Sequence, residues 1–335
     1  IILIQEIEDS SAIQKNDPDL PKASGMVVND LMYKHWDRFV TTIPHPFIAD
    51  FSDDGIGEAK DILEGEPYEC PMMPFGGIEQ LCWSPDSKTI AYTCRKKTGV
   101  QYAVSTDSDI FLYNIADGNI KNICKPSVYK EPETHSTRSF KDQGINKQEQ
   151  DCNVGYDINP KFSPDGKYIA WQSMERDGYE SDRNRLCVYD LNKKKTYVTE
   201  SFQSSVDSYC WGKDSNTLYF TGVWHGTSMV YSTNLQGRVR KLTDGICDYS
   251  IVSLSPDGQS LYIKRHSMSQ ADEIYTLALN GGTQPKQITF ENKDFYDKLS
   301  FGKVEERWIA TVDGKKEQVW VIYPPHFDAK KKYPT

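Results

Sequence analysis

The sequence predicts an all-β fold, a β-propeller of four-stranded blades, and three observations carry this prediction. A Ser-Pro-Asp turn recurs along the 335-residue chain, and two further strand-like runs follow each copy. The composition is 12% aromatic and includes 20 tyrosines, which suits many short, half-buried strands. A repeated unit of about 40–50 residues is typical of a propeller blade.

The repeated turn begins at Trp83, Phe162, Trp211 and Leu254, so the copies are 79, 49 and 43 residues apart. The two shorter spacings match one blade, and the longest matches one blade plus an insertion of about 30 residues. Proline fixes φ and cannot donate to a ladder, aspartate bonds its own backbone two residues on, and glycine accepts positive φ. Each copy is therefore predicted to be a hairpin.

Two more strand-like runs follow each turn, which makes four strands per repeat. They cover residues 109–115 and 119–124, 185–191 and 196–199, 229–234 and 239–243, and 273–279 and 286–290. A helical solenoid of similar period would need apolar residues at 3.6-residue spacing, and that spacing is absent.

Further blade material is predicted at both ends of the chain, giving about five to seven visible blades. Residues 45–51 and 58–63 are predicted as outer strands of an earlier blade, and residues 299–301, 308–312 and 318–323 as a last one. We therefore expect one propeller domain over residues 1–323, incomplete at its N-terminal blades. Pro126–Asn153 is polar and predicted to be an inserted loop, either a tolerated excursion or the lining of an entrance.

The composition excludes several classes of function. The net charge is −9, from 39 basic and 48 acidic residues, which argues against a nucleic-acid partner. No apolar run approaches the roughly 20 residues of a membrane helix. The eight cysteines form no C-x-x-C pair and are expected in the core, with at most one or two disulfides. The scattered histidines and the absence of phosphate-loop or zinc motifs predict no metal site and no cofactor.

Two segments are candidate sites. Residues 175–183 contain four acids and two arginines, among them Glu180, Asp182 and Arg183. They could form a salt-bridged loop at a blade edge, or a charged lip where a carboxylate binds a cationic substrate terminus and an arginine grips a carbonyl. The second segment, around Tyr33 and Trp36, is predicted to be a short helix or an aromatic wedge.

The Ser-Pro-Asp blades resemble the propellers of the prolyl oligopeptidase family of serine peptidases, and also Tol-type binding propellers. Three stretches are similar to the dipeptidyl peptidase V and acylaminoacyl peptidase branch of that family. They are residues 29–37, the Gly-Tyr-Glu-x-Asp-Arg segment at 178–183, and residues 319–334, which resemble the passage into a hydrolase domain.

This resemblance implies a propeller of seven or eight blades that caps an α/β-hydrolase domain and filters peptide substrates. Residues 324–335 would be the linker to that domain, which is expected to be the partner of this chain and to carry the Ser-His-Asp triad. The chain itself is thus expected to hold no catalytic residue. Glu180, Asp182 and Arg183, with Tyr33 and Trp36 as weaker candidates, are expected to bind substrate. The enzyme would release short N-terminal peptides in the periplasm or outside the cell.

A non-enzymatic, Tol-type propeller that binds protein partners is the alternative. The reading frame downstream of residue 335 discriminates the two, because a G-x-S-x-G motif followed by Asp and His marks the peptidase.

Overall fold

The computed structural model describes most of the chain. The described residues are 1–8, 13–14, 22, 24–25, 27–29, 31–125, 152–191, 194–281 and 284–334. Most of the predicted insertion at Pro126–Asn153 therefore lies outside the described residues.

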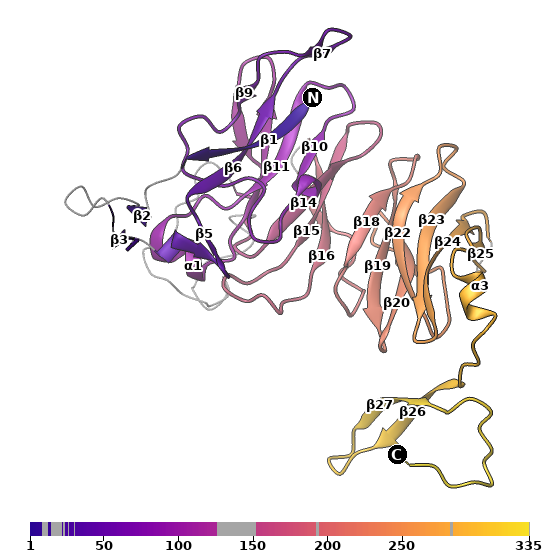
Figure 1. Cartoon of the computed structure of the whole chain (residues 1–335). Coiled ribbons are helices and arrows are strands. Elements are labelled where there is room, and N and C mark those ends of the chain that lie inside the picture. The colour runs from indigo at the N-terminus through magenta and orange to yellow at the C-terminus, as the bar shows by residue number, and fades with distance from the viewer. Residues whose placement is uncertain are drawn as a thin grey trace. The chain divides into compact units, whose positions relative to one another are not determined.

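Four consecutive four-stranded antiparallel sheets form the body of the chain, as the repeats predict (Figure 1). In each sheet the strands follow one another in chain order. The first two sheets are β10 (Leu81–Trp83), β11 (Thr89–Cys94), β12 (Asp109–Asn114) and β13 (Ile120–Asn122), then β14 (Asp157–Phe162), β15 (Tyr168–Ser173), β16 (Arg185–Asp190) and β17 (Lys194–Tyr197). The next two are β18 (Ser208–Trp211), β19 (Thr217–Trp224), β20 (Thr227–Asn234) and β21 (Arg240–Lys241), then β22 (Asp248–Leu254), β23 (Ser260–Ser267), β24 (Gln270–Ala278) and β25 (Lys286–Gln287).

Each repeated turn joins the first two strands of its sheet, where the prediction placed a hairpin. Residues of one sheet alternate between its two faces, so the Ile-Ala-Tyr pattern of β11 and its counterparts buries side chains on both sides. Meander order and four strands per repeat make these sheets propeller blades.

Incomplete sheets flank the four blades. A three-stranded sheet pairs β1 (Ile2–Glu8) with β6 (Thr42–Ile48) and β6 with β9 (Lys60–Asp61), and a hairpin pairs β26 (Val304–Ala310) with β27 (Lys316–Ile322). Residues 299–301, predicted as a strand, do not form one; they follow the helical turn α3 (Lys293–Tyr296), whose backbone bonds continue to Leu299.

Short elements complete the fold. They are β2 (Ile13–Gln14), β3 (Val27–Val28), the 3-10 helices η1 (Leu31–Tyr33) and η2 (Ile78–Gln80), β4 (Lys34–His35), β5 (Arg38–Phe39), β7 (Phe51–Ser52), β8 (Gly55–Ile56) and α1 (Gly99–Val104). No helix among the described residues has the length and apolarity that crossing a lipid bilayer requires.

A hydrophobic core joins sheet β10–β13 to sheet β14–β17. Its fully buried members include Ile110, Ile169 and Trp171, and two cysteines, Cys124 and Cys187, pack among them. None of the eight cysteines forms a disulfide, and six of them are buried and serve as small core residues, as expected.

The chain divides into two compact units, Ile1–Tyr197 and Val198–Thr335. The first contains the three-stranded sheet and two complete blades, and the second contains two complete blades and the last hairpin. A single propeller domain over residues 1–323 stays a prediction.

Candidate functional site

A cavity of about 1140 Å³ lies within the first unit, at one end of its two complete blades. It is built mainly from chain connections, with residues of β4 and β14 also in its lining. Its walls come from the connection between β11 and β12, the connection between β15 and β16, and the residues ahead of β10 and β14. In an antiparallel meander these connections emerge at the same edge, which explains why segments far apart in sequence meet here.

The cavity combines charged and aromatic side chains, as ligand sites commonly do. Its lining includes Trp36, Phe75, Arg95, Tyr102, Tyr156 and Glu180. A carboxylate and a guanidinium thus line one cavity together with several aromatic rings.

Hydrogen bonds lock the two main loops of the cavity together. The Asp177 Oδ1 accepts from the Ser105 Oγ at 2.6 Å and from the Thr106 backbone N–H at 2.8 Å. In return, the Gly178 N–H donates to the Thr106 Oγ1 at 2.9 Å. The loop that carries Glu180 is therefore held on a neighbouring blade as well as on its own.

Glu180 presents an exposed carboxylate to the cavity. The Tyr156 hydroxyl donates to its Oε1 over a long 3.5 Å contact, and no ion-pair partner of Glu180 occurs among the described residues. Burial is the main cause that raises the pKa of Tyr156, and the nearby Glu180 charge adds to it. Tyr156 therefore remains a protonated donor at neutral pH, and the Glu180 carboxylate is available to a ligand.

Arg95 places a fixed cation at the cavity wall. Its guanidinium carbon lies 4.2 Å from the centre of the Tyr102 ring, and its Nη1 donates to the Ser105 carbonyl at 2.9 Å. Stacking and hydrogen bonding together restrain the side chain. Sequence reasoning missed this residue because Arg95 stands outside every motif; only its position at the end of a buried strand could have marked it.

The second acid of the lining is the exposed Glu79. Another acid, Glu69, is buried in the segment ahead of β10 and is not part of the lining. Its carboxylate accepts from the Met73 N–H at 3.1 Å and from the Tyr102 hydroxyl, and it contacts the His35 Nε2 at 3.1 Å. These partners occupy Glu69, so it supports His35 and Tyr102 rather than facing a ligand.

Asp182 and Arg183, both predicted to bind substrate, are not part of the cavity lining. Asp182 accepts from the Arg176 N–H at 2.9 Å, from the Arg176 Nη2 at 3.0 Å and from the Arg183 N–H at 3.1 Å. Burial alone would raise the pKa of Asp182, but these bonds with Arg176 hold it below its ordinary value. Asp182 thus organises the loop that presents Glu180.

The two predicted aromatic residues have different places. Trp36 stands at the tip of the β4–β5 hairpin, with φ 52°, and its ring lies 4.9 Å from that of Phe75 in the cavity lining. Tyr33 closes η1 instead, where its carbonyl accepts from the Val40 N–H and its ring neighbours Phe39. Of the five predicted residues, the structure therefore brings Glu180 and Trp36 together in the cavity.

The chain is similar over nearly its whole length to known proteins. A protein of Porphyromonas gingivalis named dipeptidyl-peptidase 5 is 45% identical over 321 residues, which are 95% of this chain and 42% of that protein. The chain is therefore a relative of dipeptidyl-peptidase 5 over its propeller portion. The protein of the same name from Porphyromonas endodontalis is 39% identical over 337 residues, which are 100% of this chain and 45% of that protein. The chain thus spans less than half the length of these relatives.

A solved structure confirms the fold. The acylaminoacyl peptidase of Pyrococcus horikoshii matches 99% of this chain and 42% of its own chain, with a TM-score of 0.62 and 15% identity. No protein-family model matches the chain.

Proposed function

We propose that this chain is the substrate-gating and substrate-binding propeller of a serine peptidase that releases short peptides from the N-termini of its substrates. The cavity that holds Glu180 and Arg95 among aromatic side chains carries the proposal. The names of the family relatives, dipeptidyl-peptidase 5, support it. The catalytic triad would belong to an α/β-hydrolase domain outside these 335 residues, in an enzyme of the periplasm or the cell exterior.

The chemistry of the cavity suits the free N-terminus of a peptide. The terminal ammonium would donate charge-assisted hydrogen bonds to the Glu180 carboxylate, and Arg95 would donate to a peptide carbonyl or carboxylate. Trp36 and Phe75 offer apolar surface to the substrate's side chains, since their exposed fractions are 74% and 76%. A cavity of about 1140 Å³ has room for a few residues rather than a folded protein.

The test is the substitution Glu180→Gln in the full-length protein, assayed with a dipeptidyl substrate and with its N-acetylated form. A lost charged hydrogen bond of about 1.5–3 kcal/mol predicts a KM about 10- to 100-fold higher for the free-amine substrate. The acetylated substrate, which has no ammonium, should change little. Glu64→Gln is the control, because Glu64 is exposed and lies outside the cavity lining.

Unchanged kinetics with the free-amine substrate would contradict the assignment of Glu180. An equal loss with both substrates, accompanied by a lower melting temperature, would show instead that Glu180 maintains the loop.

A further inference from the structure

Three buried side chains converge where sheet β10–β13 meets sheet β14–β17. Asp109 is the first residue of β12, Cys124 follows β13, and Asp157 is the first residue of β14. Each is more than nine-tenths buried. One carboxylate oxygen from each aspartate and the Cys124 Sγ all lie within 4.8 Å of one another.

Each aspartate of this group uses one oxygen within the protein and leaves the other without a partner. The Asp109 Oδ2 accepts from the Asn122 Nδ2 at 2.8 Å and from the Lys125 Nζ at 3.0 Å, while its Oδ1 is buried and unbonded. The Asp157 Oδ1 accepts from the Trp171 Nε1 at 2.8 Å, while its Oδ2 is buried and unbonded. The Asp109 Oδ1 and the Asp157 Oδ2 are thus two buried acceptors without a hydrogen bond beside one thiol. Native proteins rarely leave such atoms unpaired, which indicates a ligand.

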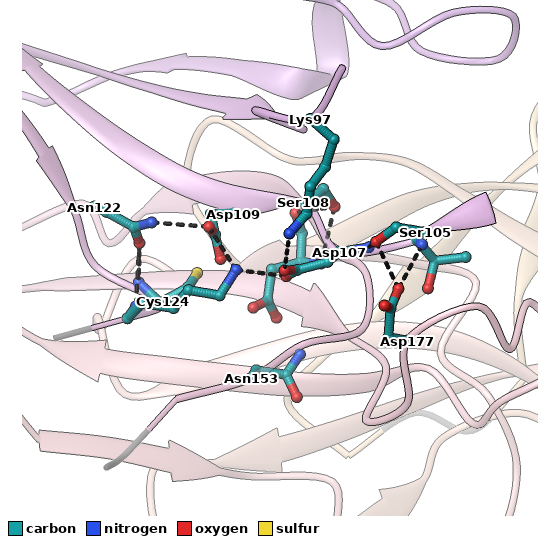
Figure 2. A network of polar contacts seen from close by, with 12 residues as sticks. Lys97, Ser105, Asp107, Ser108, Asp109, Asn122, Cys124, Asn153 and Asp177 are labelled. Atoms are coloured by element: carbon teal, nitrogen blue, oxygen red, sulfur yellow. Dashed lines mark hydrogen bonds and ion pairs between the residues drawn. The ribbon is translucent and has the colours of Figure 1, made fainter. Parts of the chain in front are cut away.

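The surrounding polar network holds these side chains in place (Figure 2). Lys125 binds Asp107 at 2.6 Å as well as Asp109, and Lys97 binds Asp107 at 3.0 Å. These two lysines balance the charges of Asp107 and Asp109. Asp157 forms no ion pair among the described residues; the nearby cation is Lys195, whose Nζ donates to the Cys124 carbonyl at 2.7 Å. Burial raises the pKa of Asp157, and the charge of Lys195 partly opposes that rise.

We propose that Asp109, Cys124 and Asp157 form a binding site for a divalent transition-metal ion, with zinc as the best match. Zinc accepts mixed thiolate and carboxylate ligands at about 2.0–2.3 Å, which sets tetrahedral ligand atoms about 3.5 Å apart. The three donor atoms lie within 4.8 Å of one another and would have to move closer together to reach that spacing. Calcium and magnesium fit less well, because they favour all-oxygen sites and do not match a thiolate.

The bonds already made by the ligands support this assignment. Metal-binding carboxylates usually carry a hydrogen bond on their other oxygen, which orients them, and Asn122 and Trp171 supply such bonds here. The Cys124 Sγ accepts from the Ile110 N–H at 3.2 Å, which orients the sulfur beside the two aspartates. A bound ion would connect two blades. It would lie next to Tyr156, the cavity-lining residue that directly precedes Asp157 in the chain.

Sequence spacing predicted no metal site, since the three ligands are 15 and 33 residues apart and include no histidine. Strand ends of two different sheets bring them together, which no local motif records.

The experiment uses the full chain after its metals have been stripped with a chelator. Cobalt(II) and then zinc are titrated, and binding is followed by the thiolate-to-cobalt charge-transfer band, by its loss on zinc displacement, and by elemental analysis. One equivalent should bind. Cys124→Ala and Asp157→Asn should each weaken binding at least about 100-fold, because even groups that only orient a ligand are worth about 10- to 100-fold.

Cys187→Ala is the matched control, because Cys187 is equally buried in the same core cluster and lies outside the proposed site. It should bind cobalt as the unaltered chain does. If the unaltered chain shows no charge-transfer band, the proposal is overturned, and a proton rather than a metal ion occupies the group. Equal loss of the band in Cys187→Ala would also overturn it. If Cys124→Ala fails to fold, the spectrum of the unaltered chain and the cobalt affinity of Asp157→Asn still test the proposed metal site.

Discussion

The serine hydroxyl of each Ser-Pro-Asp turn bonds in two directions. In the second blade, the Ser163 Oγ donates to the Asp165 Oδ1 at 2.7 Å and accepts from the Tyr168 N–H at 3.0 Å, while the Lys167 N–H also donates to Asp165. The same three bonds recur in the turns at 84–89 and 255–260. This closed network explains why the motif repeats.

The third turn lacks the serine, and a different set of hydrogen bonds closes its hairpin. Gly212 stands in the serine position, and Asp214 accepts from both the N–H and the hydroxyl of Thr217, at 2.9 and 2.7 Å. The hairpin is therefore preserved although its sequence departs from the repeat.

Ser163→Ala should destabilise the chain by about 1–3 kcal/mol at pH 7, because it removes the acceptor of the Tyr168 N–H and a donor to the Asp165 carboxylate. Partial burial by itself raises the pKa of Asp165, but hydrogen bonds from Ser163 and Lys167 bring it below the ordinary value. A carboxylate with a lowered pKa adds stability above about pH 4, and that stability is lost as the pH falls through its folded pKa. The deficit of Ser163→Ala should therefore shrink at pH 3.

Urea unfolding of both proteins at the two pH values measures this difference, with Ser181→Ala as the control for an exposed serine. A deficit that stays constant or grows on acidification would show that the Ser163–Asp165 bond is not the source.

At the scale of single elements, side chains decide where strands end. The predicted run 119–124 contains β13, but the strand stops at Asn122, whose Oδ1 accepts from the N–H groups of Cys124 and Lys125. These bonds replace the ladder and turn the chain toward the polar network. Sequence pattern locates such a strand, whereas a local side-chain bond sets its boundary.

The connection between β15 and β16 is held by Asp182, so Asp182→Ala should loosen it. Amide exchange at Arg176 and Arg183 should become at least about 10-fold faster, since about 1.5–3 kcal/mol of hydrogen bonding to a charged group is removed. Asp182→Asn retains one acceptor oxygen and should show a smaller effect. Hydrogen exchange with mass spectrometry measures both variants.

Unchanged exchange in Asp182→Ala would mean that the contacts of Asp177 with Ser105 and Thr106 suffice to hold the loop. Glu180→Gln, which breaks no bond within this loop, serves as the comparison.

At the scale of the whole molecule, no serine hydroxyl bonds a histidine in the part of the chain that the structure describes. His35, His45 and His266 contact acids instead. Among the described residues that line the cavity of the first unit, no serine is therefore activated by a histidine base.

A fluorophosphonate probe should accordingly leave these 335 residues unlabelled, and it should label the full-length protein at a serine outside them. Mass spectrometry of the labelled peptide identifies that serine. Stoichiometric labelling within the chain would contradict the proposed division of binding and catalysis.

The blades could be predicted from the repeats alone, because each hairpin turn and its strands depend on bonds within about a dozen residues. The sequence also marked Glu180 and Trp36, which stand in recognisable segments. Only the tertiary structure showed that Arg95 belongs with them, and that Asp109, Cys124 and Asp157 converge. Those groups meet through the pairing and packing of whole sheets, and such long-range contacts leave no spacing in the sequence that could be read in advance.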